Sequence, residues 1–173
     1  MKRIIILMML GMLVFAGCSK DSDKNTGEEV NKEQENTNSE DEEVKVHEFD
    51  VQVLADELLS GIKFEDELGA GRDIVLINQY EIEEGDFVKQ ASYFSSNATT
   101  EEIAVVECEN EEKAKELEKA FEDRVAARKE VFADYAPDEV KRLDGAVIKV
   151  LGKYVVLCVC AEPELAESII DKY

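Results

Sequence analysis

The chain has 173 residues and a formal net charge of −21, because 41 acidic residues face only 20 basic ones. A surface of this charge repels nucleic-acid phosphates and anionic lipid headgroups, both of which bind clusters of Lys and Arg. Nucleic acid is therefore excluded as a partner, whereas cations or a basic partner would be attracted, though only loosely.

The first seventeen residues have the pattern of an export signal. Lys2 and Arg3 form a short cationic start, and residues 4–15 are an uncharged apolar run. This run is shorter than the roughly 20 residues that a membrane-spanning helix needs. Small residues then precede Cys18, as they precede the cleavage site of a secretory signal. We therefore expect residues 1–17 to be a signal peptide.

Residues 15–18, with the sequence Phe-Ala-Gly-Cys, resemble the lipobox of bacterial lipoproteins, although an aliphatic residue is commoner at the position of Phe15. The resemblance implies cleavage before Cys18 and a thioether-linked diacylglycerol on its sulfur, with further acylation such as palmitate. Two acyl chains suffice for stable anchoring, so we expect a lipid anchor on the outer face of the cell membrane. The alternative is an ordinary signal peptide followed by an unrelated cysteine.

Residues 18–48 have the composition of an acidic tether. Residues 19–43 contain ten acids, three lysines, no aromatic residue and one aliphatic residue, Val30. Such a segment cannot bury enough apolar surface to offset the entropy of ordering. We therefore expect a disordered tether from Cys18 to residue 48, and a single domain over residues 49–173, a length that can bury about two-thirds of its surface.

The domain is predicted to begin with a helix capped by Asp50, since apolar residues from Val51 to Leu59 recur at helical spacing. Residues 62–80 are ambiguous, with a loop at Gly69-Ala70-Gly71 and an apolar run that fits either type of element. Residues 87–94 and 103–108 are rich in strand-forming residues, and polar loop residues around Asn97 separate them.

The longest predicted helix begins at Asn110 and continues to Tyr135, ahead of Pro137. Strands at 146–151 and 154–160 follow, joined by Gly152-Lys153, a two-residue loop with Gly first that is typical of a type II′ turn. A last helix starts at Pro163. This order predicts the α+β class, as a two-layer sandwich with the long helix packed on an antiparallel sheet.

Several of these segments together are similar to one family. They are Glu102-Ile103-Ala104-Val105-Val106, the helix at 110–135, Tyr135-Ala136-Pro137-Asp138-Glu139-Val140, and Ala146-Val147-Ile148 leading into Gly152-Lys153-Tyr154-Val155. With the lipobox and the acidic tether, the chain resembles lipoproteins of domain-of-unknown-function family 4358, found mainly in Gram-positive bacteria. The resemblance covers most of residues 50–160. It implies an envelope location and an α+β fold, and it carries no activity, ligand or catalytic residue.

No catalytic residue is predicted. The only histidine, His47, lies at the tether boundary, away from any predicted pocket. Catalytic schemes that pair a Ser or Cys nucleophile with histidine need an imidazole held in a pocket, so they are not expected here. Nucleotide-binding and nucleophile-elbow motifs are absent from the sequence, and Gly69-Ala70-Gly71 is better explained as a turn. Paired carboxylates can act without histidine, but acids are so numerous here that chance pairs carry little information.

Three cysteines remain once Cys18 is lipidated, an odd number that argues against a disulfide scaffold. Cys158 and Cys160 lie on one face of a predicted strand. We expect these two and Cys108 to be core residues. The alternative is a thiol pair, with or without Cys108, that binds a soft metal or serves redox chemistry. A disulfide between residues two apart in a strand would be strained.

Carboxylates of Glu81, Glu83, Glu84 and Asp86 surround Gly85, and their density suits a hard cation such as Ca²⁺. The spacing of an EF-hand is absent, so we expect a solvated acidic turn, no metal site and no cofactor. The function expected is therefore a non-enzymatic, surface-tethered binding or interaction module. The alternatives are a ligand- or cation-binding accessory of an envelope or transport system and, third, a histidine-free hydrolase.

Overall fold

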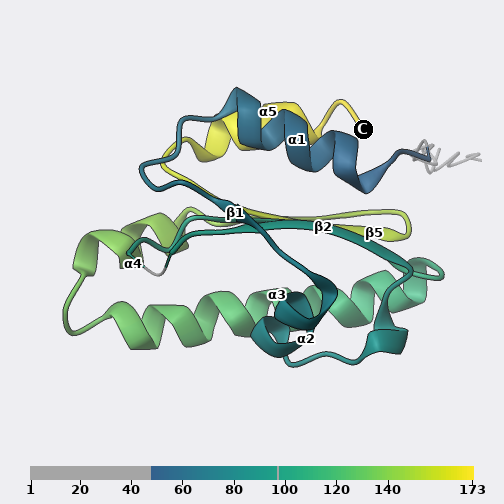
Figure 1. Cartoon of the computed structure of the whole chain (residues 1–173), viewed down its shortest axis with the longest axis horizontal. Helices are drawn as coiled ribbons and strands as arrows, with labels where there is room; N and C mark the ends of the chain where they lie inside the picture. The colour runs from purple at the N-terminus through teal and green to yellow at the C-terminus, as the bar shows by residue number, and fades with distance from the viewer. Residues whose placement is uncertain (1–47, 97) are drawn as a thin grey trace, which may run out of the picture. The chain divides into compact units, whose positions relative to one another are not determined.

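Five antiparallel strands form a sheet in the order β1-β2-β3-β5-β4 (Figure 1). The computed structural model describes residues 48–96 and 98–173; the predicted signal peptide, Cys18, the tether up to His47, and Asn97 lie outside them. The strands are β1 (Gly69–Ala70), β2 (Lys89–Phe94), β3 (Glu102–Glu107), β4 (Val147–Leu151) and β5 (Tyr154–Val159). The helices are α1 (Val51–Gly61), α2 (Asp73–Tyr80), α3 (Glu111–Phe132), α4 (Pro137–Asp144) and α5 (Pro163–Ile170), with a 3-10 helix at Glu84–Asp86.

The α+β class, the antiparallel sheet and the long helix are confirmed. The number of layers differs from the prediction, because helices cover both faces of the sheet. Figure 1 shows α1 and α5 on one face and α2 and α3 on the other. The apolar contacts form two clusters accordingly, one between the sheet and α1 with α5, and one between the sheet and α3 with α2.

Strand β3 shows why two helical layers are needed. Side chains alternate along a strand, so Ile103 and Val105 contact the α1 side while Ala104 and Val106 contact the α3 side. All four are fully buried. A strand that is apolar on both faces requires cover on both. Helices on one face alone would leave one of these two pairs exposed.

The helix boundaries follow the predicted capping residues. Asp50 accepts a hydrogen bond from the backbone N–H of Gln52 (2.8 Å), and Asn110 accepts one from the N–H of Lys113 (2.9 Å). Each satisfies one of the backbone donors that the first turn of a helix leaves free. The β4–β5 hairpin also has the expected register, with Leu151 opposite Tyr154. Gly152 has a φ of 57°, which the first position of a type II′ turn demands.

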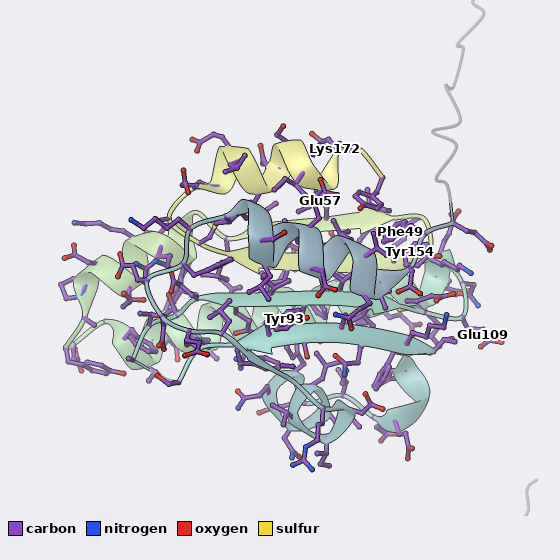
Figure 2. The ribbon with its side chains drawn as sticks, turned by 45° about the horizontal axis from the view of Figure 1, so that its top comes forward. Phe49, Glu57, Tyr93, Glu109, Tyr154 and Lys172 are labelled. Carbon is purple, nitrogen blue, oxygen red and sulfur yellow. The ribbon has the colours of Figure 1, made fainter. Side chains whose placement is uncertain are left out.

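The two ends of the domain meet beside the β4–β5 turn. The ring of Phe49 stacks on Tyr154 with a centroid distance of 4.1 Å, and it meets Tyr173 edge-on at 5.0 Å. Figure 2 shows Phe49 beside Tyr154, and the labelled pair Glu57 and Lys172, whose ion pair of 2.7 Å joins α1 to the C-terminal residues. The chain therefore enters the fold through an aromatic contact with its own C-terminus.

The segment at Gly69-Ala70-Gly71, predicted as a loop, contains the edge strand β1, which pairs with the end of β2. The N–H of Gly71 donates to the carbonyl oxygen of Ser92 (2.7 Å). A Cβ on Gly71 would collide with the side chains of Ser92 and Phe94. Glycine is thus required here by close approach of β2.

Replacing Gly71 with alanine is expected to lower the free energy of unfolding by about 1–3 kcal/mol, because the side chains of Ser92 and Phe94 must move to accept the methyl group. The matched control is Gly85→Ala, where no atom lies within 4 Å of the added Cβ. Chemical denaturation of the two variants beside the parent protein measures the difference. Equal stability of both variants would contradict the requirement for glycine at residue 71.

Candidate functional site

Two carboxylates are buried where β3 begins. Glu101 and Glu102 are 0% and 1% exposed, although acidic residues are rarely buried without partners. Because they are neighbours along extended backbone, their side chains point to opposite faces of the sheet. The two carboxylates therefore have different sets of partners.

The carboxylate of Glu102 is held by four charge-assisted or hydroxyl hydrogen bonds. Arg124 donates from Nε and Nη2, each at 2.7 Å, in a bidentate arrangement. The Tyr80 hydroxyl donates at 2.6 Å, and Arg128 donates from Nη1 at 3.0 Å. Bidentate Arg–carboxylate pairs are among the strongest polar contacts in proteins. Glu102 thus fixes α2 and α3 to the centre of the sheet.

The pKa values of the surrounding groups follow from burial and from this charge. Burial, with the negative charge of Glu102 beside it, raises the pKa of Tyr80 well above its ordinary value. Burial alone would lower the pKa of Arg124, but the hydrogen bonds to Glu102 and its negative charge outweigh burial. The pKa of Arg124 is therefore raised. For Arg128 burial prevails and lowers the pKa. Its buried Nε has no hydrogen-bond partner among the described residues.

Glu101 serves the other face of the sheet. Its carboxylate accepts hydrogen bonds from the backbone N–H groups of Glu65 (3.0 Å) and Asp66 (2.9 Å), which lie between α1 and β1. The Thr99 hydroxyl donates at 3.3 Å. The guanidinium of Arg142 lies 4.0 Å away. The role of Glu101 is to tie this connecting segment to the sheet.

A third carboxylate, Glu139 of α4, completes the arrangement. It accepts from the backbone N–H of Thr100 (2.6 Å), from the Thr100 hydroxyl (2.9 Å) and from Arg142 (2.6 Å). Burial would raise the pKa of Glu139, but these donors together lower it. Arg142 also pairs with Glu65 at 2.8 Å. We call these groups the acid–arginine network: Tyr80, Thr100, Glu101, Glu102, Arg124, Arg128, Glu139 and Arg142.

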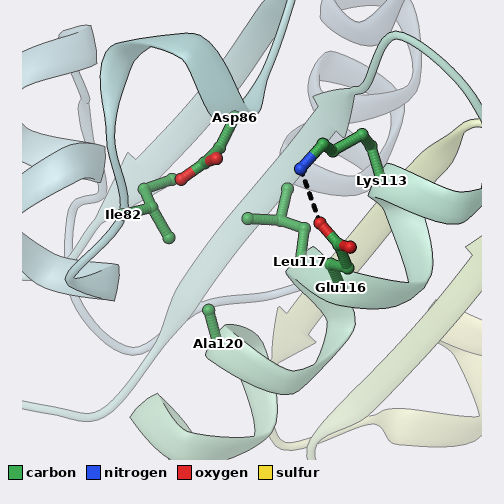
Figure 3. Close-up of a pocket in the computed structure, with 6 residues that line it drawn as sticks. All are labelled: Ile82, Asp86, Lys113, Glu116, Leu117 and Ala120. Atoms are coloured by element: carbon green, nitrogen blue, oxygen red, sulfur yellow. Dashed lines mark hydrogen bonds and ion pairs between the residues drawn. The ribbon is translucent and has the colours of Figure 1, made fainter. Parts of the chain in front are cut away.

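A surface groove runs between α2 and α3, next to this network. One part has a volume of about 460 Å³, and an adjoining part of about 210 Å³ shares Glu116 and Ala120 with it. Figure 3 shows the smaller part, with Ile82 and Asp86 on one side and α3 residues on the other, including the ion pair of Lys113 and Glu116 (2.6 Å). We define the α2–α3 groove by Gln79, Tyr80, Glu81, Ile82, Asp86, Lys113, Glu116, Leu117, Lys119, Ala120, Asp123 and Arg124.

The groove has a fixed floor and charged walls. Tyr80 and Arg124 line it and are held from beneath by Glu102. Nη1 of Arg124 also donates to the backbone oxygen (3.1 Å) and side-chain oxygen (2.7 Å) of Gln79. Glu81 lines the groove with a φ of 54°, in the left-handed region that a residue other than glycine seldom adopts. The groove is therefore built on groups that internal contacts already hold in place.

The three cysteines are buried, as the sequence predicts. Cys158 and Cys160 both lie on the α1 and α5 side of the sheet, whereas Cys108 lies on the α3 side. Cys108 is therefore separated from the other two by the sheet, and a site using all three thiols is not formed. Burial, together with the charge of Asp86, raises the pKa of Cys108 to about 11.

The acidic turn makes contacts within itself. Glu83 and Asp86 cap the 3-10 helix reciprocally, and Asp86 accepts from the N–H of Glu83 at 2.8 Å. Across residues 48–96 and 98–173, no group of three or more potential ligands is arranged to hold a metal ion. Over the same residues, none of the helices combines the length and the apolar character needed to cross a bilayer.

The acid–arginine network was missed at the level of sequence. A signal for it is the position of Arg124 and Arg128, which are spaced four apart. They fall within the stripe of Phe121, Val125 and Phe132, whose side chains are buried. Two arginines on the buried face of a helix require acidic partners, and Glu102 at the start of an apolar strand supplies one.

The domain is thus an antiparallel α+β protein with helices on both faces and a buried acid–arginine network where its third strand begins. The family model described as a domain of unknown function, DUF4358, matches residues 64–160. The chain belongs to this family. The match runs from the segment before β1 through β5, so that α1 and α5 lie outside it. Neither the curated proteins nor the solved structures contain a match to the chain.

Proposed function

We propose that the chain is a lipoprotein anchored on the outer face of the cell membrane through Cys18, and that its domain is a non-enzymatic binding module. The anchor is supported by the signal-like residues 1–17 and by Ala16-Gly17-Cys18. The acidic residues that follow support a tether. Together these two features are what an exported protein held at a membrane by a flexible segment would need.

The binding role is inferred from the buried acids, whose carboxylates are engaged in hydrogen bonds within the protein. Glu101, Glu102 and Glu139 each accept several internal hydrogen bonds, and they hold the elements of the fold together. A catalytic acid or base needs a proton-transfer position that a substrate can reach. These carboxylates stabilise the fold instead, and the α2–α3 groove is the concave surface that they support.

The groove suits a ligand of mixed polarity. Its walls carry both signs of charge, as in the exposed pair Lys119–Asp123 (2.8 Å), and its smaller part is lined by the apolar Ile82 and Leu117. We assign this surface to a protein partner. A second candidate is a small-ligand accessory of an envelope system, because a volume of about 460 Å³ falls within the usual range of small-molecule sites.

The proposal is tested by photo-crosslinking on intact cells, with the reactive residue placed at Lys119 in the full-length chain. The matched control carries it at Glu164, which is exposed on α5 on the opposite face of the sheet. We expect a discrete protein adduct from residue 119 and none from residue 164. Adducts of equal yield from both positions, or from neither, would contradict a protein-binding groove.

A further inference from the structure

The outer face of α3 continues past the α2–α3 groove. The part of the groove with a volume of about 460 Å³ is lined by Ala120 and Ala127 of this helix. Residues seven apart share one face of a helix, and Val131 follows Ala127 by four residues, so it lies on the same face. These side chains therefore lead out of the groove toward the C-terminal end of α3. Figure 1 shows that end of α3 extending past α2, next to α4.

Two apolar side chains at this end of α3 are left in contact with water. Val131 and Tyr135 are 61% and 65% exposed, the highest values among the large apolar side chains of the described residues. The Tyr135 ring lies 5.2 Å from that of Phe132, which is buried, so it is held at the end of the helix. Tyrosine is among the residues that most often anchor protein interfaces. We define the α3 row by Ala120, Ala127, Val131 and Tyr135.

Acidic side chains border the α3 row on one side. Glu116, Asp123 and Glu130 are spaced seven apart, so they also share one face of the helix. The first two pair with lysines of the same helix, at 2.6 and 2.8 Å. In the part of the chain that the structure describes, neither Glu130 nor Asp134 takes part in an ion pair. The uncompensated negative charge therefore lies beside the two exposed apolar side chains.

We propose, on the basis of the protein-binding function assigned to the groove, that the docking surface extends along the whole α3 row and that its occupant is an amphipathic helix of a protein partner with basic residues along one border. The two alanines let the backbone of the partner helix approach closely. Val131 and Tyr135 contact its apolar side chains, as in other grooves that bind an amphipathic helix. Glu130 and Asp134 attract its lysines or arginines.

A helix fits this surface better than an extended strand or a second copy of the chain. Strand addition depends on hydrogen bonds between main chains, and the middle of α3 offers none, because its N–H and C=O groups are paired within the helix. A second copy would bring the same row of acids and its own net charge of −21. From Ala120 to Val131 the row is about 16 Å long at 1.5 Å per residue, which is three turns of a partner helix.

The test places the photo-reactive residue at Asp123 and, separately, at Glu130 of the full-length chain on intact cells. These positions are about 10 Å apart along the helix axis at 1.5 Å per residue. Peptide mass analysis identifies the partner residue joined to each. We expect both residues in one segment of one protein, about seven residues apart, because a partner helix advances equally per residue. A separation of about three residues, as in a strand that advances about 3.3 Å per residue, or a second copy of the chain as the adduct, would overturn the proposal.

Paired variants test the exposed end of the α3 row, with the reactive residue at Lys119. Val131→Asp is compared with Val53→Asp, because Val53 is 56% exposed on α1, on the opposite face of the sheet. We expect Val131→Asp to lower the adduct yield at least about fivefold and Val53→Asp to leave it within about twofold of the parent. Glu130→Lys should lower the yield at least about threefold, whereas Glu164→Lys on α5, with the same change of net charge, should not. Circular dichroism confirms that each variant is folded.

The outcomes separate the extended surface from the function proposed for the groove. An adduct from residue 119 whose yield is unchanged by Val131→Asp and by Glu130→Lys would overturn the α3 row as a docking surface, and it would leave the groove as a protein-binding site. The absence of any adduct from residue 119 in the parent chain would overturn the protein-binding groove, and the α3 row with it.

Discussion

Replacing Glu102 with glutamine is expected to lower the free energy of unfolding by about 3–5 kcal/mol, the range for breaking one side of a buried ion pair. The amide keeps the shape of the side chain but leaves Arg124 and Arg128 without a counter-charge. Their side chains are only 7% and 14% exposed, so water cannot replace the carboxylate fully. The chain has no tryptophan, and urea unfolding is best followed by circular dichroism.

The matched control for Glu102→Gln is Asp123→Asn on the same helix that carries Arg124. The pair of Asp123 with Lys119 is solvent-exposed, and its loss should change stability by no more than about 1 kcal/mol. A loss below about 1 kcal/mol for Glu102→Gln would contradict the structural role assigned to the network. Replacement of Glu102, Arg124 and Arg128 together by apolar residues of similar size should recover much of the loss, because no unpaired charge then remains.

Replacing Cys18 with alanine is expected to move the protein from the membrane to the aqueous phase. In the proposed anchor two acyl chains give stable attachment, and the variant lacks the sulfur that would carry the proposed diacylglycerol. Detergent phase partitioning of the full-length protein and the variant measures the change, with Cys108→Ala as a control that keeps Cys18. Recovery of the parent protein in the aqueous phase would contradict lipidation at Cys18.

The elements of the fold could be predicted because their signals are local. Asp50 and Asn110 cap the helices that they were expected to cap, and Gly152 has the backbone conformation that its turn requires. The ambiguous residues 62–80 contain β1 and α2, and neither has a strong pattern of its own. β1 is only two residues long and is defined by its pairing with β2, a contact distant in sequence.

The layers and the network could not be predicted from such signals. Which face of β5 meets which helix is decided by packing between segments far apart in the chain. The partners of Glu102 lie 22 residues before it, 22 after it and 26 after it. In a chain with 41 acidic residues, nothing local marks Glu102 as the one that binds two arginines. The sequence signal for the network is the position of Arg124 and Arg128 within a helical stripe of apolar residues.

The strand order has a consequence for the sequence of folding events. The central strands β3 and β5 pair Glu102 with Val159 and Glu107 with Tyr154, so the middle of the sheet joins segments about fifty residues apart. Contacts of such long range form slowly, since a large loop must close first. Because the chain is synthesised from its N-terminus, β3 can pair only with β2 until β5 has been made. The β3–β5 pairing at the centre of the sheet is therefore expected to form late, after the nearer pairing of β2 with β3.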